Sequence, residues 1–167
     1  MTPQEASTLA NHLLSTFERE SQITRKVIAA LPEDQGGYRI HPKSRTALEL
    51  AWHIVLMEMW FLDSIFQGQF YSGADSKLPD EIKTSADVIT WYDGQFPENF
   101  AKAQKLSGDY LARPMSFLKK SEYPGVIYLQ IVLSHTIHHR GQLAAYLRAM
   151  GAKVPCIYGG SLDEPAQ

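Results

Sequence analysis

The sequence contains almost no cysteine: Cys156 is the single one among 167 residues. One cysteine cannot form a disulfide within the chain, and such scarcity is typical of proteins from a reducing compartment. The N-terminal stretch carries Glu5 early and has no apolar core followed by a small-residue cleavage site, so it does not resemble a secretory signal. We therefore expect a cytoplasmic protein.

Basic runs and long apolar runs are also missing. The only adjacent pairs of Lys or Arg are Arg25-Lys26 and Lys119-Lys120, and the net charge is -2, so no nucleic-acid partner is expected. The most apolar window, residues 48–66, is too interrupted to span a membrane. Four ionisable side chains break it: Glu49, His53, Glu58 and Asp63. This window is predicted to be a buried helix of a globular protein.

Several catalytic motifs are absent. The sequence has no phosphate-binding glycine loop, no Gly-x-Ser-x-Gly and no Cys-x-x-Cys. Thr136 follows His135, at the position where a zincin protease of the His-Glu-x-x-His type requires a glutamate base. No base is evident near Cys156, so a nucleophilic role for this thiol is not expected. The histidines remain as the main candidates for chemistry.

Helical periodicity is the dominant pattern that is present. Apolar residues recur at helical spacing in four segments: 3–31, 47–66, 85–108 and 124–150. Pro97 inside the third segment predicts a kink or a break, and residues 109–123 are predicted to form an irregular or hairpin-like excursion. Residues 68–84 form a long connection, and the sequence leaves open whether it covers a site as a lid. We predict one all-α domain, a four-helix bundle over residues 1–167.

Histidines in two of these segments predict a metal site. Three of the six histidines lie within five residues of the fourth segment, and helical spacing places His135 and His139 on one face and His138 on the polar side. His53 is one of few polar residues in the second segment, and a buried imidazole needs a partner. His53, His135 and His139 are therefore predicted to form a three-histidine site with room for water or substrate. Zinc, nickel, copper and iron all suit imidazole ligands.

Neighbouring residues are candidates for supporting roles, and each has a structural alternative. Glu49 lies four residues before His53 and is predicted to orient it as a hydrogen-bond acceptor. Without a metal, the same contact would satisfy a core histidine. Tyr128 and Tyr146 share the angular sector of the histidine pair, so their hydroxyls are candidates to reach a bound ligand, although such tyrosines are more often core residues. Arg140 is expected either to contact an anionic substrate or cofactor or to form an inter-helix salt bridge.

Two stretches together resemble the signature of the DinB/YfiT-like superfamily. They are His135-x-x-His138-His139-Arg140-Gly141-Gln142-Leu143-x-x-Tyr146-Leu147-Arg148-x-x-Gly151-x-x-Val154-Pro155 and Leu50-Ala51-Trp52-His53-Ile54. The similarity extends over most of the chain. It implies a bundle of up-up-down-down type, often a homodimer, with a divalent metal such as nickel or zinc held by His53, His135 and His139.

The resemblance also implies classes of function. Family members that are understood include thiol transferases that use bacillithiol or mycothiol, a mycothiol-dependent isomerase and proposed metal-dependent hydrolases. We therefore expect an enzyme acting on a small molecule, in which the metal lowers the pKa of a low-molecular-weight thiol that attacks an electrophile. The alternatives are a hydrolase using metal-bound hydroxide and a non-catalytic stress-response bundle stabilised by the metal. No motif selects one metal, thiol or substrate.

Overall fold

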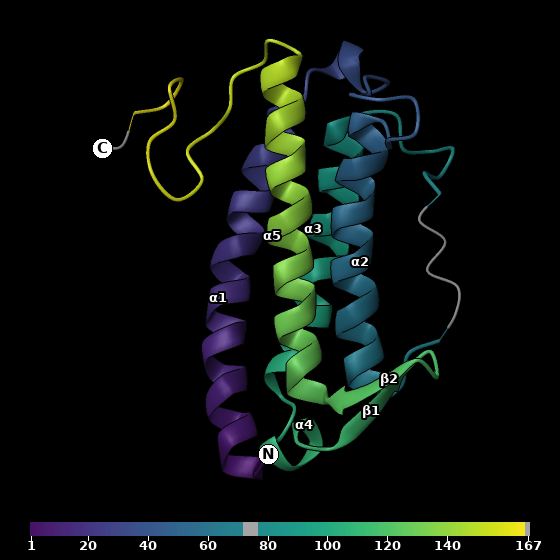
Figure 1. Ribbon diagram of the computed structural model, residues 1–167, viewed down its shortest axis with the longest axis vertical. Helices are drawn as coiled ribbons and strands as arrows, with labels where there is room; N and C mark the ends of the chain where they lie inside the picture. The colour runs from purple at the N-terminus through teal and green to yellow at the C-terminus, as the bar shows by residue number, and fades with distance from the viewer. Residues whose placement is uncertain (72–76, 166–167) are drawn as a thin grey trace.

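The four predicted helices form a bundle in the computed structural model, which describes residues 1–71 and 77–165 (Figure 1). The elements in chain order are α1 (Pro3–Ala29), a 3-10 turn (Glu33–Gln35), α2 (Ala47–Gln67), α3 (Ser85–Gln104), the short α4 (Gly108–Leu111), β1 (Pro114–Phe117), β2 (Ser121–Pro124) and α5 (Gly125–Ala149). Strands β1 and β2 pair antiparallel, so the expected hairpin-like excursion is confirmed. Within the described residues, no helix is both long and apolar enough to cross a membrane.

The direction of the helices differs from the expected up-up-down-down order: they run up, down, down and up (Figure 1). The Ser85 hydroxyl at the start of α3 donates to the Leu31 carbonyl just beyond α1, at 3.3 Å. The Tyr110 hydroxyl beyond the end of α3 donates to the Phe66 carbonyl near the end of α2, at 2.7 Å. Helices α2 and α3 are therefore parallel. The connection of residues 68–84 has enough residues to span the roughly 30 Å of α2.

Side-chain capping fixes where three of the long helices begin. Thr2, Thr46 and Thr84 each accept a hydrogen bond from the backbone N–H three residues later, in a reciprocal capping box. Helix α3 continues through Pro97, so the break considered from the sequence does not occur. Phe96 and Phe100 stack on each other at 5.1 Å on the buried side of α3, and their packing stabilises the helix around the exposed proline.

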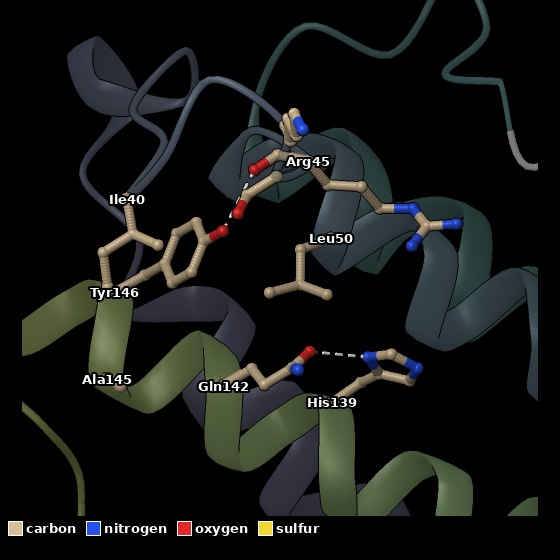
Figure 2. Close-up of a pocket in the computed structure, with 9 residues that line it drawn as sticks. Ile40, Arg45, Leu50, His139, Gln142, Ala145 and Tyr146 are labelled. Atoms are coloured by element: carbon tan, nitrogen blue, oxygen red, sulfur yellow. Dashed lines mark hydrogen bonds between the residues drawn. The ribbon is translucent and has the colours of Figure 1, made fainter.

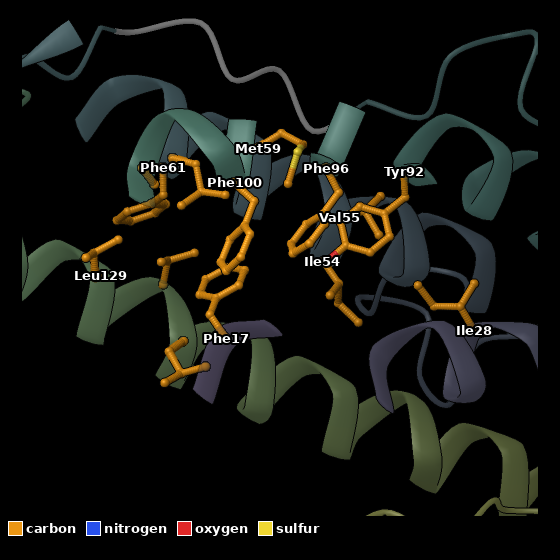
Figure 3. Packing of buried hydrophobic residues seen from close by; sticks show 14 of the residues in the cluster. Phe17, Ile28, Ile54, Val55, Met59, Phe61, Tyr92, Phe96, Phe100 and Leu129 are labelled. Atoms are coloured by element: carbon orange, nitrogen blue, oxygen red, sulfur yellow. The ribbon is translucent and has the colours of Figure 1, made fainter. Parts of the chain in front are cut away.

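The core lies between the helices, and α2 is buried along most of its length (Figure 3). Phe17 of α1 packs against Phe96 and Phe100 of α3, with ring centroids 6.2 and 6.4 Å apart. Ile54 and Val55 of α2 are fully buried beside them. The contacts of α2 with α3 and α5 explain its apolar sequence, and they carry His53 into the interior with 7% of its surface exposed.

Candidate metal centre

Three histidine side chains from two helices meet between α2 and α5. The Nε2 atoms of His53 and His135 are 3.2 Å apart, and the ring of His139 lies 4.7 Å from that of His53 and 4.3 Å from that of His135. One nitrogen from each ring lies within 4.8 Å of the other two. Imidazole nitrogens on a tetrahedral ion lie about 3.3 Å apart, given bonds of about 2.0–2.1 Å. The cluster therefore fits a divalent metal ion.

The helical geometry predicted from the sequence explains which histidines meet. His135 and His139 are one helical turn apart on α5 and face α2, where His53 is presented. His138 is exposed; its ring is 4.9 Å from that of His139, but it does not belong to the cluster. The structure thus brings together the three histidines that were predicted to form the site and leaves His138 outside it.

The environment of the cluster keeps its imidazoles neutral near pH 7. Burial lowers the pKa of His53 to about 3 and that of His135 to about 4, and it also lowers the pKa of His139. The positive charge of Arg45 contributes to the lowered pKa of all three. Because a metal binds only the unprotonated nitrogen, protons do not compete with a metal for these ligands at neutral pH.

Gln142 supports His139, a role that was not predicted from the sequence. Its Oε1 lies 2.7 Å from Nδ1 of His139. If the amide oxygen accepts, His139 carries its proton on Nδ1 and turns the unprotonated Nε2 to the cluster. The signal in the sequence was the three-residue spacing on one helix, which brings the two side chains together.

Replacing Gln142 by leucine is expected to weaken metal binding about 10- to 100-fold, because the ring of His139 loses the partner that fixes its orientation and tautomer. Competition with a chromophoric chelator measures this affinity. Gln130→Leu is the matched control, since Gln130 lies on the same helix and bonds Ser134 outside the cluster. Equal affinities for the two variants would contradict the role of Gln142.

Glu49 and Tyr128 do not take the positions expected for them. The Glu49 carboxylate accepts from the Thr46 backbone N–H at 2.7 Å, because the unpaired amides of the helix N-terminus draw it back. Nδ1 of His53 is buried without a hydrogen-bond partner among the described residues, so the expected contact from Glu49 is not formed. The Tyr128 hydroxyl donates to the Met115 carbonyl at 2.8 Å. Tyr128 shares the angular sector of His135 but lies two turns, about 10 Å, farther down the helix.

Arg140 faces α1 instead of the histidines. Its guanidinium is buried and forms an ion pair with Glu20 at 2.5 Å. It also donates to the Tyr158 hydroxyl at 2.6 Å, which ties the C-terminal segment to the bundle. The expected contact with a substrate or cofactor is therefore not available, and the alternative of an inter-helix salt bridge describes this residue.

A pocket of about 670 Å³ opens beside the cluster, between α5 and the segment that leads into α2 (Figure 2). Its lining consists of Ile40, Lys43, Ser44, Arg45, Leu50, His139, Gln142, Ala145 and Tyr146. Of the three clustered histidines, His139 is the one that lines it. Tyr146 is thus placed in the pocket, as its angular position suggested, but its hydroxyl donates to the Arg45 carbonyl at 3.1 Å.

A buried acid, Glu58, connects the same helices, and no role was predicted for it from the sequence. Glu58 of α2 accepts hydrogen bonds from the Tyr92 hydroxyl of α3 and from the Thr136 hydroxyl of α5, the latter at 2.9 Å. Complete burial raises the pKa of Glu58 to about 7. The sequence indicated this role only by the presence of an acidic residue in the middle of an otherwise apolar helix. Its bond to Thr136 fixes the residue next to His135 and so holds α5 against α2.

Comparison with known proteins identifies the family of this chain and several relatives. The model of the DinB family matches residues 4–167. The chain is 27% identical over 159 residues to YrdA of Bacillus subtilis, covering 94% of this chain and 92% of that protein. It is 24% identical over 144 residues to YjoA of the same organism, covering 85% and 91%.

Two crystal structures share the fold. A DinB-like protein from Bacillus cereus superimposes with a TM-score of 0.74 at 23% identity, over 87% of this chain and 95% of that one. YjoA from Bacillus subtilis gives a TM-score of 0.71 at 23% identity, over 87% and 97%. These likenesses support the bundle architecture.

Proposed function

The chain belongs to the DinB family, and from this premise we propose that it binds a divalent metal ion, nickel or zinc, and uses it as an enzyme acting on small molecules. His53, His135 and His139 would be the ligands, with Gln142 holding His139. The donor set consists of three neutral imidazoles, which nickel and zinc both accept.

The pocket beside His139 is the observation that carries the enzymatic proposal. Purely structural zinc sites are closed by four protein ligands, whereas catalytic sites retain three protein ligands and one open position. Here three imidazoles meet, and one of them lines a pocket of about 670 Å³, within the size range of small-molecule sites. A ligand in this pocket would therefore lie beside the metal.

We infer that the reaction is thiol transfer. A divalent ion at this cluster would lower the pKa of a bound thiol, supplying a nucleophile near neutral pH. The sulfur forms a bond to an electrophilic carbon, the leaving group departs with its electron pair, and the thiol proton passes to solvent. Leu50 and Ala145 would form apolar contacts with the substrate. Gln142 would keep His139 in the tautomer that binds the metal.

Two alternatives use the same cluster. Hydrolysis would take water in place of the thiol, with the same lowering of pKa. In a non-catalytic bundle the metal would fasten α2 to α5, so that metal binding contributes directly to folding stability.

A cobalt-substituted protein tests thiol transfer against the non-catalytic alternative. Addition of 2-mercaptoethanol is expected to produce a sulfur-to-cobalt charge-transfer band in the near ultraviolet, because the open position admits the thiol. The His53→Ala protein treated in the same way is the control for adventitious cobalt. An unchanged spectrum in the parent, despite one cobalt per chain, would refute thiol transfer. If metal removal also lowered Tm strongly, that result would favour the non-catalytic alternative.

A further inference from the structure

The side-chain amide of Gln142 has an oxygen and a nitrogen, and the hydrogen bond to His139 uses one of them. Its Oε1 atom lies 2.7 Å from Nδ1 of His139. Its Nε2 atom carries two N–H groups and makes no hydrogen bond to any residue that the structure describes. Gln142 lines the pocket beside the cluster, and its side chain is exposed. A free hydrogen-bond donor therefore lies in the pocket, next to a candidate metal ligand.

The orientation of this amide follows from the role of His139 as a ligand. Nδ1 of His139 is the nitrogen beside Gln142, so Nε2 of the ring is the one left to bind a metal. A nitrogen that binds a metal carries no proton, so the single N–H of the neutral imidazole is on Nδ1. This N–H needs an acceptor, and the oxygen is the only acceptor of an amide side chain. Gln142 thus turns Oε1 to His139, which leaves both of its own N–H groups for the pocket.

The neighbouring side chains leave this position to Gln142. Tyr146 also lines the pocket from α5, but its hydroxyl already donates to the Arg45 carbonyl at 3.1 Å. Figure 2 shows the amide of Gln142 below Leu50, with its oxygen toward the ring of His139. A ligand whose reacting atom lies beside His139 would therefore meet the amide donor of Gln142 and the apolar side chain of Leu50.

An amide donor held in this way suits a carbonyl oxygen. When a thiolate attacks a carbonyl carbon, the π electrons of the C=O bond move to the oxygen, and negative charge develops there. N–H groups that are in place before the reaction stabilise this charge without having to reorient. The hydrogen bond to His139 holds the amide of Gln142 in place. The sulfur nucleophile at the cluster and the amide donor would thus act on the carbon and the oxygen of the same carbonyl group.

We propose that Gln142 donates a hydrogen bond from Nε2 to the carbonyl oxygen of the substrate, and that the electrophile is an acyl compound. This inference rests on the proposed thiol transfer at the three-histidine cluster. The sulfur forms a bond to the acyl carbon, the carbonyl forms again as the leaving group departs with its electron pair, and the thiol proton passes to solvent. The product is a thioester. Gln142 is then a catalytic residue in addition to its contact with His139.

Two thiols of the same shape test the donor. Methyl 3-mercaptopropionate carries an ester carbonyl, whereas in 3-methyl-1-pentanethiol a methyl group and a methylene group replace the two ester oxygens. Each thiol is titrated into the cobalt-loaded protein, and the sulfur-to-cobalt charge-transfer band measures its affinity. The readout is the ratio of the two affinities, ester thiol over alkane thiol, compared between the parent and its variants.

The Gln142→Glu protein separates the donor from the acceptor. A glutamate keeps an oxygen for Nδ1 of His139 but has no N–H group, so cobalt should bind as it does in the parent. The affinity ratio is expected to fall about two- to tenfold, because one hydrogen bond is lost. Gln130→Glu introduces the same charge on the same helix outside the pocket and should leave the ratio unchanged. An unchanged ratio in Gln142→Glu, or an equal fall in both variants, would overturn the proposal.

The NMR signals of the Gln142 side-chain amide give a second readout. In isotope-labelled, zinc-loaded protein these N–H signals are identified by their loss in Gln142→Glu. They are expected to move downfield with the ester thiol and to stay in place with the alkane thiol, and equal shifts with the two thiols would overturn the proposal. If both thiols bind cobalt with the same ratio in every variant, thiol binding stands and acyl recognition by Gln142 is refuted. If neither thiol binds, the proposed function is refuted, and this inference with it.

Discussion

The His135→Ala protein is expected to retain less than about one tenth of the metal bound by the parent, which should carry about one ion per chain. His135 lies at the centre of the cluster, with its Nε2 3.2 Å from that of His53 and its ring 4.3 Å from that of His139. Two imidazoles alone hold an ion far less tightly than three. Elemental analysis of protein purified without a histidine tag or chelator measures the loss.

His138→Ala is the matched control for this loss. The two histidines lie three residues apart on α5, but His138 is exposed and outside the cluster, so its variant should keep the metal. His53→Ala should behave like His135→Ala, because it removes the ligand supplied by α2. Full metal content in both cluster variants would show that the ligands are wrongly assigned. A parent that binds no divalent ion even after reconstitution would refute the metal site itself.

The Arg140→Met protein is expected to lose about 3–5 kcal/mol of unfolding free energy, because the substitution leaves the carboxylate of Glu20 buried without its cation. Both partners are almost inaccessible: Arg140 is 1% exposed and Glu20 7%. The substitution also removes the donor to the Tyr158 hydroxyl, and with it one tie to the C-terminal segment. Urea denaturation of the metal-free protein measures the difference.

Arg148→Met provides the comparison on the same helix. Arg148 pairs with Asp163 at the same distance of 2.5 Å, but its side chain is 51% exposed, so this variant should lose no more than about 1 kcal/mol. The double variant Glu20→Met/Arg140→Met should recover much of the stability, because no buried charge is left unpaired. Equal losses for Arg140→Met and Arg148→Met would contradict the structural role of the buried pair. Unchanged metal binding by folded Arg140→Met would show that the buried pair stabilises the bundle without contributing to the metal site.

The helices and the candidate metal ligands could be predicted from patterns within single segments of the chain. Helical spacing alone put His135 and His139 on one face and His138 on another, and the structure shows the same arrangement. The apolar sequence of α2 predicted burial on several sides, which carried His53 inside. These properties depend on the rotation of about 100° per residue within one helix, so they can be read from the sequence without knowing the neighbours.

The sequence by itself thus determined which residues are helical and which histidines share a face, and its motifs pointed to the family. Only the tertiary structure decided what each side chain meets. Angular position placed Tyr128 with the histidines, but the axial rise of the helix separates them. The direction of the Arg140 side chain on its own helix did not reveal that its partner is Glu20 of α1. The pocket beside His139 likewise depends on the path of residues 40–45 beside α5. Contacts between distant segments arise from the packing of whole helices, which no local periodicity encodes.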